Sequence, residues 1–427
     1  MTRINGHSSS ASIASPVSTG WRLHSSYVAQ RTLNPIRKFV EGERASPNPE
    51  KELVNLTLGD PTASGIFRID DSCSKAVIHA ILSAKANGYP PAIGTEEARQ
   101  AIASRYSRPN AILCSKDIIV TSGTSGALDI CFTALCDEGD NVLIPRPGFP
   151  LYGTLARSKG IEERYYDLVP EHNWEADIEQ METLVDERTK FIVVNNREHL
   201  LAIIALAQKH YLPILADEVY EDMVFSPHIF YPLASLSATV PVLTVSGLGK
   251  RFLVPGWRVG WILIHDPVNA FAKEARDGLV SVSQLILGAN SLIQAALPKI
   301  FTNTPQLFFE CTNRAFENHA RTLSSLLTNI PGLRVIEPQG AMYMMVGIDI
   351  KRFSGLQNDI EFARRLMEEE SVNVLPGTIF QCPNFIRIAI SAPLADLEEA
   401  AQRLHAFCQR HLHIDINAYI YLRYNLR

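Results

Sequence analysis

Short apolar runs alternate with amphipathic segments from residue 117 to residue 248. Runs such as 118–120 (IIV) and 212–216 (LPILA) are apolar throughout, which predicts strands buried on both faces. The segments between them repeat apolar residues every three or four positions, as amphipathic helices do. The pattern predicts strands at 117–123, 141–145, 163–169, 190–196, 212–220 and 242–248, and helices at 124–139, 148–160, 175–187 and 197–210. Such alternation is typical of an α/β fold with a mostly parallel sheet flanked by helices.

The two ends of the chain lack this regular alternation. From about residue 331 strands and helices mix, so we expect a smaller α+β domain there, joined to the first by a long helix through 285–296 and onward. Near the other end, 33–41 predicts a helix and 53–58 a short strand. The expected organisation is a disordered arm at 1–30, a segment at 31–85 that packs with the small domain, a large domain at 86–300, a small C-terminal domain at 301–412 and a tail at 413–427.

Composition narrows the classes of function. The net charge of -5 provides no basic field, so we expect neither nucleic acid nor an anionic membrane as a partner. No segment has the long uncharged apolar run of a membrane helix. Seven scattered cysteines without a CxxC pair predict reduced thiols in a cytoplasmic protein, and they predict no metal site.

The first forty residues leave a second location open. They contain Arg3, Arg22, Arg31 and Arg37, and no acidic residue precedes Glu41, which is also typical of a mitochondrial transit segment. The stretch 8–20 (SSSASIASPVSTG) has no apolar stripe of its own, which favours a disordered polar arm instead.

Residues 246–261 (SGLGKRFLVPGWRVGW) are the most informative stretch. The small residues before Lys250 let a planar ring approach the backbone, and the lysine amine could then bond covalently to an aldehyde. Arg258 offers a planar fork that can bind a phosphate through two hydrogen bonds. A lone lysine is usually a solvated surface residue, but this pairing suits a cofactor that carries both an aldehyde and a phosphate.

Polar residues at the ends of the predicted strands add to this hypothesis. Ser122, Gly123 and Thr124 open a helix, where free backbone N–H groups favour a phosphate, although they could equally form a plain helix cap. Asp217 ends a buried strand, and an acid there needs a cation such as a protonated pyridine nitrogen. A magnesium-binding acid of an NTPase is disfavoured, because the GLGK lysine follows this strand and Arg251 stands where a hydroxyl is needed.

Three further residues have both a structural and a functional interpretation. Phe149, in the turn PRPGFPLY, could lie flat on a planar ring or simply belong to the core. Arg387 lies inside the apolar stretch FIRIAI, where it should bind an anion unless a local acid pairs with it. Tyr89 is presented by the stiff turn NGYPP.

Together these segments resemble the class I aminotransferases of fold type I, which depend on pyridoxal 5'-phosphate. Further motifs occur in that family's order from Leu33 to His411, namely LNPIR, LGDPT, NGYPP, IPRPGFPLY, WEADIEQMETLVDE, PILADEVYEDMVF, LVPGWRVGWILIHD, GAMYMMVGID and NFIRIAI. The resemblance implies a homodimer with its sites at the interface. It also implies that the cofactor is bound by Lys250, Ser122, Gly123, Thr124, Phe149, Asp217, Tyr220 and Arg258, and by Tyr89 across the interface.

The resemblance also assigns chemical roles. Lys250, Asp217 and Tyr220 are implied to be catalytic, with Asp217 at the pyridine nitrogen and Tyr220 at the ring 3-oxygen. Arg387 and Gly59 are implied to bind the substrate α-carboxylate. The match is best with the branch that transfers the amino group of L-tyrosine to 2-oxoglutarate. A broader aromatic or alanine-type aminotransferase remains an alternative, as does a lyase or synthase on the same scaffold.

One segment departs from the family pattern. The family continues after the strand 190–196 with a turn of the type Asn-Pro-Ser-Asn-Pro-Cys-Gly, whereas here Asn196 is followed directly by Arg197-Glu198-His199. The shorter connection is locally plausible, because Asn195 and Glu198 resemble a capping box at the start of the next helix. The missing turn is implied to carry the asparagine that binds the ring 3-oxygen. A folded but catalytically impaired chain is therefore a second hypothesis.

Overall fold

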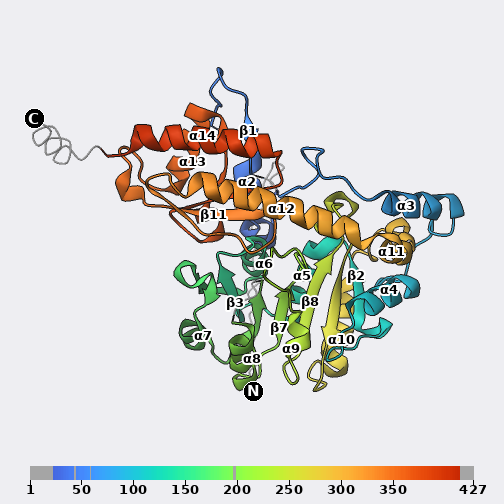
Figure 1. The fold of residues 1–427 in the computed structure, drawn as a ribbon. Coiled ribbons are helices and arrows are strands. Elements are labelled where there is room, and N and C mark those ends of the chain that lie inside the picture. Colours follow the sequence, from blue (N-terminus) through green and yellow to red (C-terminus); the bar gives the residue numbers. More distant parts are fainter. Residues whose placement is uncertain (1–22, 43–44, 58, 196–198, 414–427) are drawn as a thin grey trace, which may run out of the picture.

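An eight-stranded sheet forms the centre of the larger part of the molecule (Figure 1). The computed structural model describes residues 23–42, 45–57, 59–195 and 199–413. The strand order is β2-β9-β8-β7-β6-β3-β4-β5, and the five central strands β8, β7, β6, β3 and β4 run parallel to one another. The bounds are β2 (Ile118–Thr121), β3 (Asn141–Arg146), β4 (Glu162–Val169), β5 (Glu175–Ala176), β6 (Thr189–Val194), β7 (Ile214–Asp217), β8 (Val242–Gly247) and β9 (Gly260–His265). The predicted α/β fold is confirmed.

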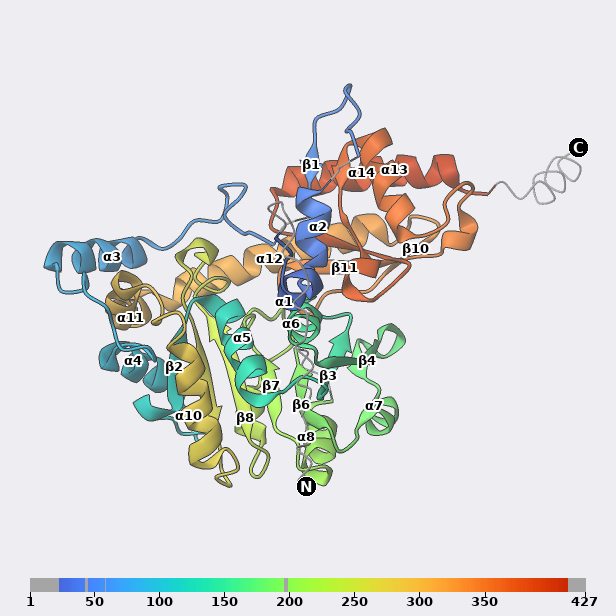
Figure 2. The same cartoon turned by 180° about the vertical axis from the view of Figure 1, so that it is seen from behind.

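Helices cover both faces of this sheet because its strands are apolar on both sides. In β6, Phe191 and Val193 pack toward one layer of helices, and Ile192 and Val194 pack toward the other. The first layer contains α5 (Gly123–Leu135), α6 (Leu151–Lys159) and α10 (Ala272–Ser283), and α5 and α10 lie in front of the sheet in Figure 2. The second contains α3 (Asp71–Ser83), α4 (Glu96–Tyr106), α7 (Ile178–Leu184), α8 (Leu200–Lys209), α9 (Leu233–Leu236) and α11 (Ser291–Asn303).

A second core is built around a four-stranded antiparallel sheet of order β10-β11-β14-β13. Its strands are β10 (Leu333–Val335), β11 (Tyr343–Ile348), β13 (Leu375–Pro376) and β14 (Phe385–Ala389), and it packs against α12 (Gln306–Leu327), α13 (Asp359–Glu370) and α14 (Leu394–His411). The N-terminal part includes α1 (Tyr27–Arg31), α2 (Pro35–Glu41) and β1 (Val54–Asn55), and β1 pairs in parallel with β12 (Val372–Asn373). Most of the expected arm at 1–30 lies outside the described residues.

The structure corrects three predicted elements. Residues 175–176 belong to β5 instead of a helix, because they pair with the end of β4, and the Asp177 side chain then caps α7. The long helix expected through 285–296 is interrupted, because Gly288 has a φ of 86° and the Asn290 side chain caps a new helix, α11. The strand expected at 53–58 is limited to the two residues of β1.

Three other features of the described residues bear on the sequence predictions. All seven cysteines are free thiols. No cluster of His, Cys, Asp or Glu suitable for a metal ion occurs among the residues that the structure describes. None of the described helices is long and apolar enough to cross a membrane.

The start of β9 passes close to the start of α5, and Gly260 permits this approach. A Cβ atom on Gly260 would lie 2.6 Å from the backbone carbonyl carbon of Gly123 and from the amide nitrogen of Thr124. We expect Gly260→Ala to destabilise the protein by about 1–3 kcal/mol, because the backbone must move. Gly278→Ala is the matched control: this glycine lies within α10, its added Cβ would meet only one atom at 3.8 Å, and alanine should stabilise by about 0.5–1 kcal/mol. Urea unfolding of both variants tests this; equal stabilities would contradict it.

Candidate active site

Lys250 lies in the turn that follows β8, and its amine points into the interior between the two cores. Its Nζ donates a hydrogen bond to the backbone carbonyl of Gly59 at 2.5 Å and lies 5.8 Å from the centroid of the Tyr220 ring. The structure therefore brings together three predicted site residues from distant parts of the chain. Gly59 has no space for a side chain, because its Cβ would lie 1.6 Å from the Tyr343 hydroxyl.

Asp217 is the last residue of β7, the strand next to β8. The Tyr152 hydroxyl donates to its carboxylate at 2.7 Å, and the Val219 amide donates to it at 3.3 Å. Burial raises its pKa to about 6, while these two hydrogen bonds and the charge of Lys250 act in the opposite direction. No cation lies within ion-pair distance of Asp217 among the described residues. A protonated ring nitrogen would supply the missing charge, as the sequence predicted.

The predicted phosphate residues come together at the start of α5. The Arg258 guanidinium occupies the space beside Gly123, where an added Cβ would lie 2.3 Å from its Nη2. Gly123 has a φ of 74°, which glycine adopts without strain. Ser122 precedes the helix and makes no side-chain cap hydrogen bond, so its hydroxyl is available to an anion together with the free N–H groups of the first turn. Thr124 lies in that same turn.

Arg387 lies in β14 and has a side chain without an acidic partner. The residue is 8% exposed, its Nη2 donates to the Thr57 carbonyl at 2.6 Å, and its Nε has no hydrogen-bond partner among the described atoms. Burial lowers its pKa, which the neighbouring tyrosines partly offset. The alternative of a local acidic partner is therefore wrong for the residues that the structure describes. The geometry fits a site for a carboxylate.

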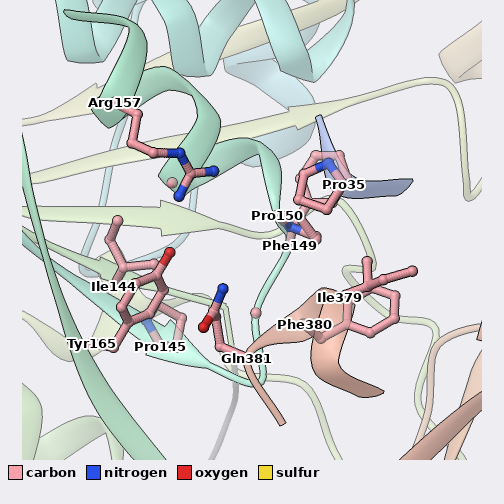
Figure 3. A pocket seen from close by; sticks show the side chains of 12 residues that line it. Pro35, Ile144, Pro145, Phe149, Pro150, Arg157, Tyr165, Ile379, Phe380 and Gln381 are labelled. Atoms are coloured by element: carbon pink, nitrogen blue, oxygen red, sulfur yellow. The ribbon is translucent and has the colours of Figure 1, made fainter. Parts of the chain in front are cut away.

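The two predicted aromatic residues lie further from this cluster. Phe149 is 39% exposed and packs edge-on against Tyr152, with ring centroids 5.8 Å apart. It also lines a small hollow together with Pro35 and Phe380 (Figure 3), and Phe380 in turn stacks on the Arg387 guanidinium at 4.6 Å. Tyr89 is 91% exposed, so it takes no part in the site of its own chain.

Two tyrosines of the site were missed by the sequence analysis. Tyr152 supports Asp217, and Tyr343 accepts a hydrogen bond from Tyr220 at 3.1 Å. Both lie in motifs that carried the family resemblance, PRPGFPLY and GAMYMMVGID. The only available signal for Tyr343 was a single hydroxyl at the start of a strand that is otherwise apolar.

The shortened connection between β6 and α8 lies partly outside the described residues, which resume at His199. The predicted capping box is wrong, because the N-cap residue of α8 is His199, which makes no side-chain cap bond. His199 instead contacts Glu175 at 3.1 Å and the Ala176 carbonyl at 3.3 Å. Asn195, the last described residue before this connection, lies near the Tyr152 hydroxyl and acts to lower its pKa. Asn195 thus lies beside the residue that supports Asp217.

Comparison with known proteins gives a consistent result. The family described as aminotransferase class I and II matches residues 51–404. The chain is 47% identical to the tyrosine aminotransferase of Homo sapiens over 92% of this chain and 89% of that protein. It is 45% identical to the tyrosine aminotransferase of Mus musculus over 96% of this chain and 92% of that protein. The crystal structure of tyrosine aminotransferase from Leishmania infantum is similar in fold, with a TM-score of 0.89, 35% identity and coverage of 92% and 100% of the two chains.

The environment of Asp217 makes a prediction about the cofactor-free protein. Folding raises the pKa of the Asp217 carboxyl from 3.8 to about 6. The stability that this shift contributes is fully present below pH 3.8 and is lost as the pH rises through about 6. The difference corresponds to at most about 3 kcal/mol. We therefore expect the Asp217→Asn apoprotein to be more stable than the wild-type apoprotein at pH 8, and to lack the wild type's decline between pH 4 and 6.

Urea unfolding of the apoproteins across this pH range measures the effect. Asp277→Asn, on the surface of α10, is the control and should leave the pH profile of the wild type unchanged. A profile for Asp217→Asn that parallels the wild type would show that Asp217 does not carry the cost of an unpaired buried charge.

Proposed function

Because the chain belongs to the class I and II aminotransferases, we propose that it transfers the amino group of L-tyrosine to 2-oxoglutarate with pyridoxal 5'-phosphate, giving 4-hydroxyphenylpyruvate and glutamate. The observation that carries the proposal is the grouping of a lysine amine, an unpaired acid and an unpaired arginine, contributed by Lys250, Asp217 and Arg387. Identity of 45–47% with tyrosine aminotransferases over most of the chain supports the choice of amino donor.

The residues present fit the cofactor at both of its ends. Arg258 and the first turn of α5 would hold the phosphate, and Asp217 would hold the ring nitrogen in its protonated form. Tyr220 would face the ring 3-oxygen. When bound, the cofactor supplies an electron sink for the charge that develops at the α-carbon of the amino acid.

The protein side chains then perform binding and proton transfer. Arg387 binds the α-carboxylate of the amino acid through its guanidinium fork, which fixes the α-carbon relative to Lys250. The Lys250 amine acts as the general base that removes the α-proton and holds it for return to the product. The rings of Phe380 and Tyr343 both pack against the Arg387 guanidinium and hold it in place.

Lys250→Ala tests the central step. We expect the loss of nearly all transamination of L-tyrosine with 2-oxoglutarate, by at least about a hundredfold, because the general base is removed. Lys273→Ala, on the exposed surface of α10, is the matched control and should keep full activity. Near-normal activity of Lys250→Ala would contradict the mechanism.

The choice of amino donor is tested on the wild type. Its kcat/KM should fall in the order tyrosine, phenylalanine, alanine. A higher kcat/KM for alanine than for tyrosine would move the assignment to an alanine-type enzyme.

The homodimer is supported by an apolar surface next to Tyr89. Leu82 on α3 and Leu285 after α10 are 80% and 79% exposed. Their elements are neighbours, because α3 packs against α11 and the Ser291 hydroxyl donates to the Ala86 carbonyl at 2.6 Å. Large exposed apolar residues in one region are typical of a subunit interface. A second copy of the chain that covers this surface would bring its Tyr89 to the site, and the active unit is then the dimer.

Leu285→Asp should convert this dimer to monomers and reduce activity with it, because a charge would be buried without a partner. Ile229→Asp serves as the control, since Ile229 is 67% exposed in a different loop. Light scattering after size-exclusion chromatography gives the mass of each variant. A wild-type monomer, or an active monomeric variant, would contradict the dimer.

The shortened loop makes a separate prediction about cofactor affinity. Insertion of the family's Asn-Pro-Cys-Gly turn before Arg197 should tighten cofactor binding by roughly ten- to a hundredfold, because a hydrogen bond to a charged oxygen is worth about 1.5–3 kcal/mol. An insertion of equal length made of Gly and Ser is the control. Titration of the apoproteins with pyridoxal 5'-phosphate measures the affinity, and equal affinities for the wild type and the Asn-Pro insertion would show that the shortened loop does not impair the chain.

A further inference from the structure

Two cations, the buried Arg387 and the partly buried Lys250, lie in the site without an acidic partner among the described residues. Lys250 enters from the turn after β8, and Arg387 enters from β14 of the smaller sheet. Neither forms an ion pair with any Asp or Glu among the described residues, and both donate to backbone carbonyls instead, those of Gly59 and Thr57. Like charges in a poorly solvated site repel each other, so a negative charge near both would stabilise this arrangement.

The hydroxyl of Tyr343 lies where the two cations meet. It interacts with the Lys250 amine and accepts a hydrogen bond from Tyr220 at 3.1 Å. The Arg387 guanidinium lies 4.0 Å from the centroid of the Tyr343 ring. Strand pairing produces this contact, because Tyr343 on β11 is opposite Ala389 on β14 and therefore diagonal to Arg387.

The surroundings of Tyr343 favour its ionised form. Burial alone raises its pKa, but the charges of Lys250 and Arg387 and the hydrogen bonds from Tyr220 and Lys250 outweigh burial and bring the pKa down to about 8. Its neighbour Tyr220 has a pKa well above the ordinary value, chiefly through burial and the proximity of Tyr343. Tyr220 therefore stays the donor of the pair. The remaining charged group near the cluster, Asp217, interacts with Tyr220 and Lys250.

We propose that Tyr343 is a positioning residue of the carboxylate site: in alkaline solution its phenolate balances the charges of Lys250 and Arg387 while the site is empty, and it takes up a proton when a substrate carboxylate binds Arg387. The exchange is balanced in charge. The incoming carboxylate brings one negative charge, and the phenolate gives one up by accepting one proton from solvent to become a neutral hydroxyl. This inference rests on the proposed function only in that Arg387 binds a carboxylate.

The consequence is that carboxylate affinity depends on pH through Tyr343. Above the pKa of Tyr343, about 8, binding requires the uptake of one proton, so affinity should fall by about tenfold for each pH unit. Below that pH the phenol is already protonated and affinity should level off. A tyrosine that only packed against Arg387 would give no such dependence.

The first experiment titrates the full-length apoprotein by ultraviolet difference absorbance, which detects ionised tyrosine. Wild type should show about one tyrosine that ionises near pH 8. This component should be lost in Tyr343→Phe and kept in the control Tyr211→Phe, whose side chain is 94% exposed on the loop between α8 and β7.

The second experiment uses the holoenzyme and the unreactive ligand 3-phenylpropanoate. Calorimetric titrations at pH 9 in two buffers of different ionisation enthalpy count the protons taken up on binding. Wild type and Tyr211→Phe should take up about one proton more than Tyr343→Phe.

Each outcome decides the proposal. A wild-type apoprotein without the early-ionising tyrosine overturns it, even if Tyr343→Phe does not fold. Equal proton uptake by wild type and Tyr343→Phe also overturns it, while leaving the proposed function intact if L-tyrosine is still transaminated. Failure of the proposed function has a different signature, the absence of transamination by a wild type whose Tyr343 titrates as expected.

Discussion

The site depends on the free-energy cost of burying charged side chains that have no oppositely charged partner among the described residues. Asp217 and Lys250 stand at the carboxyl ends of adjacent parallel strands, β7 and β8, where the strand pairing places Asp217 opposite Val245 and the turn after Gly247 carries the lysine. Arg387 comes from the other core. Folding therefore brings an acid and two cations close to one another, but among the described residues their hydrogen bonds come from a hydroxyl and from backbone groups instead of opposite charges. This is the condition under which a charged cofactor and a charged substrate gain most from binding.

The N-terminal segment connects the two cores at this point. The carbonyl of Thr57 accepts from Arg387 and the carbonyl of Gly59 accepts from Lys250, so two residues of one short segment each satisfy a cation from a different core. The segment itself is held by the pairing of β1 with β12 and by the hydrogen bond from the Ala389 amide to the Leu56 carbonyl. Its position is thus fixed by two strands of the C-terminal part of the chain, β12 and β14. A change in the contacts of either cation is transmitted to the same short piece of backbone.

Sequence reasoning located the site where a polar residue interrupts an apolar pattern. Asp217 and Arg387 could be found because a charge at the end of, or within, a buried strand requires an explanation. Tyr343 was missed because a tyrosine among apolar residues is equally well explained by packing. The interruption of the expected long helix was missed because apolar residues in the sequence were interpreted as buried residues. Leu285, Ile286 and Leu287 look like core residues in the sequence, yet all three are exposed.

The shortened loop affects the two ends of the ring site differently. Asp217 keeps its support, because Tyr152 lies in α6 and donates to the carboxylate independently of the β6–α8 connection. Asn195 is the last described residue before that connection, and its side chain lies near the Tyr152 hydroxyl, whose pKa it acts to lower. To replace the missing asparagine at the ring 3-oxygen, Asn195 would have to leave this position beside Tyr152. In the proposed arrangement of the cofactor, the loss should therefore be felt at the 3-oxygen, which Tyr220 would still face, and hardly at the ring nitrogen, which Asp217 would bind.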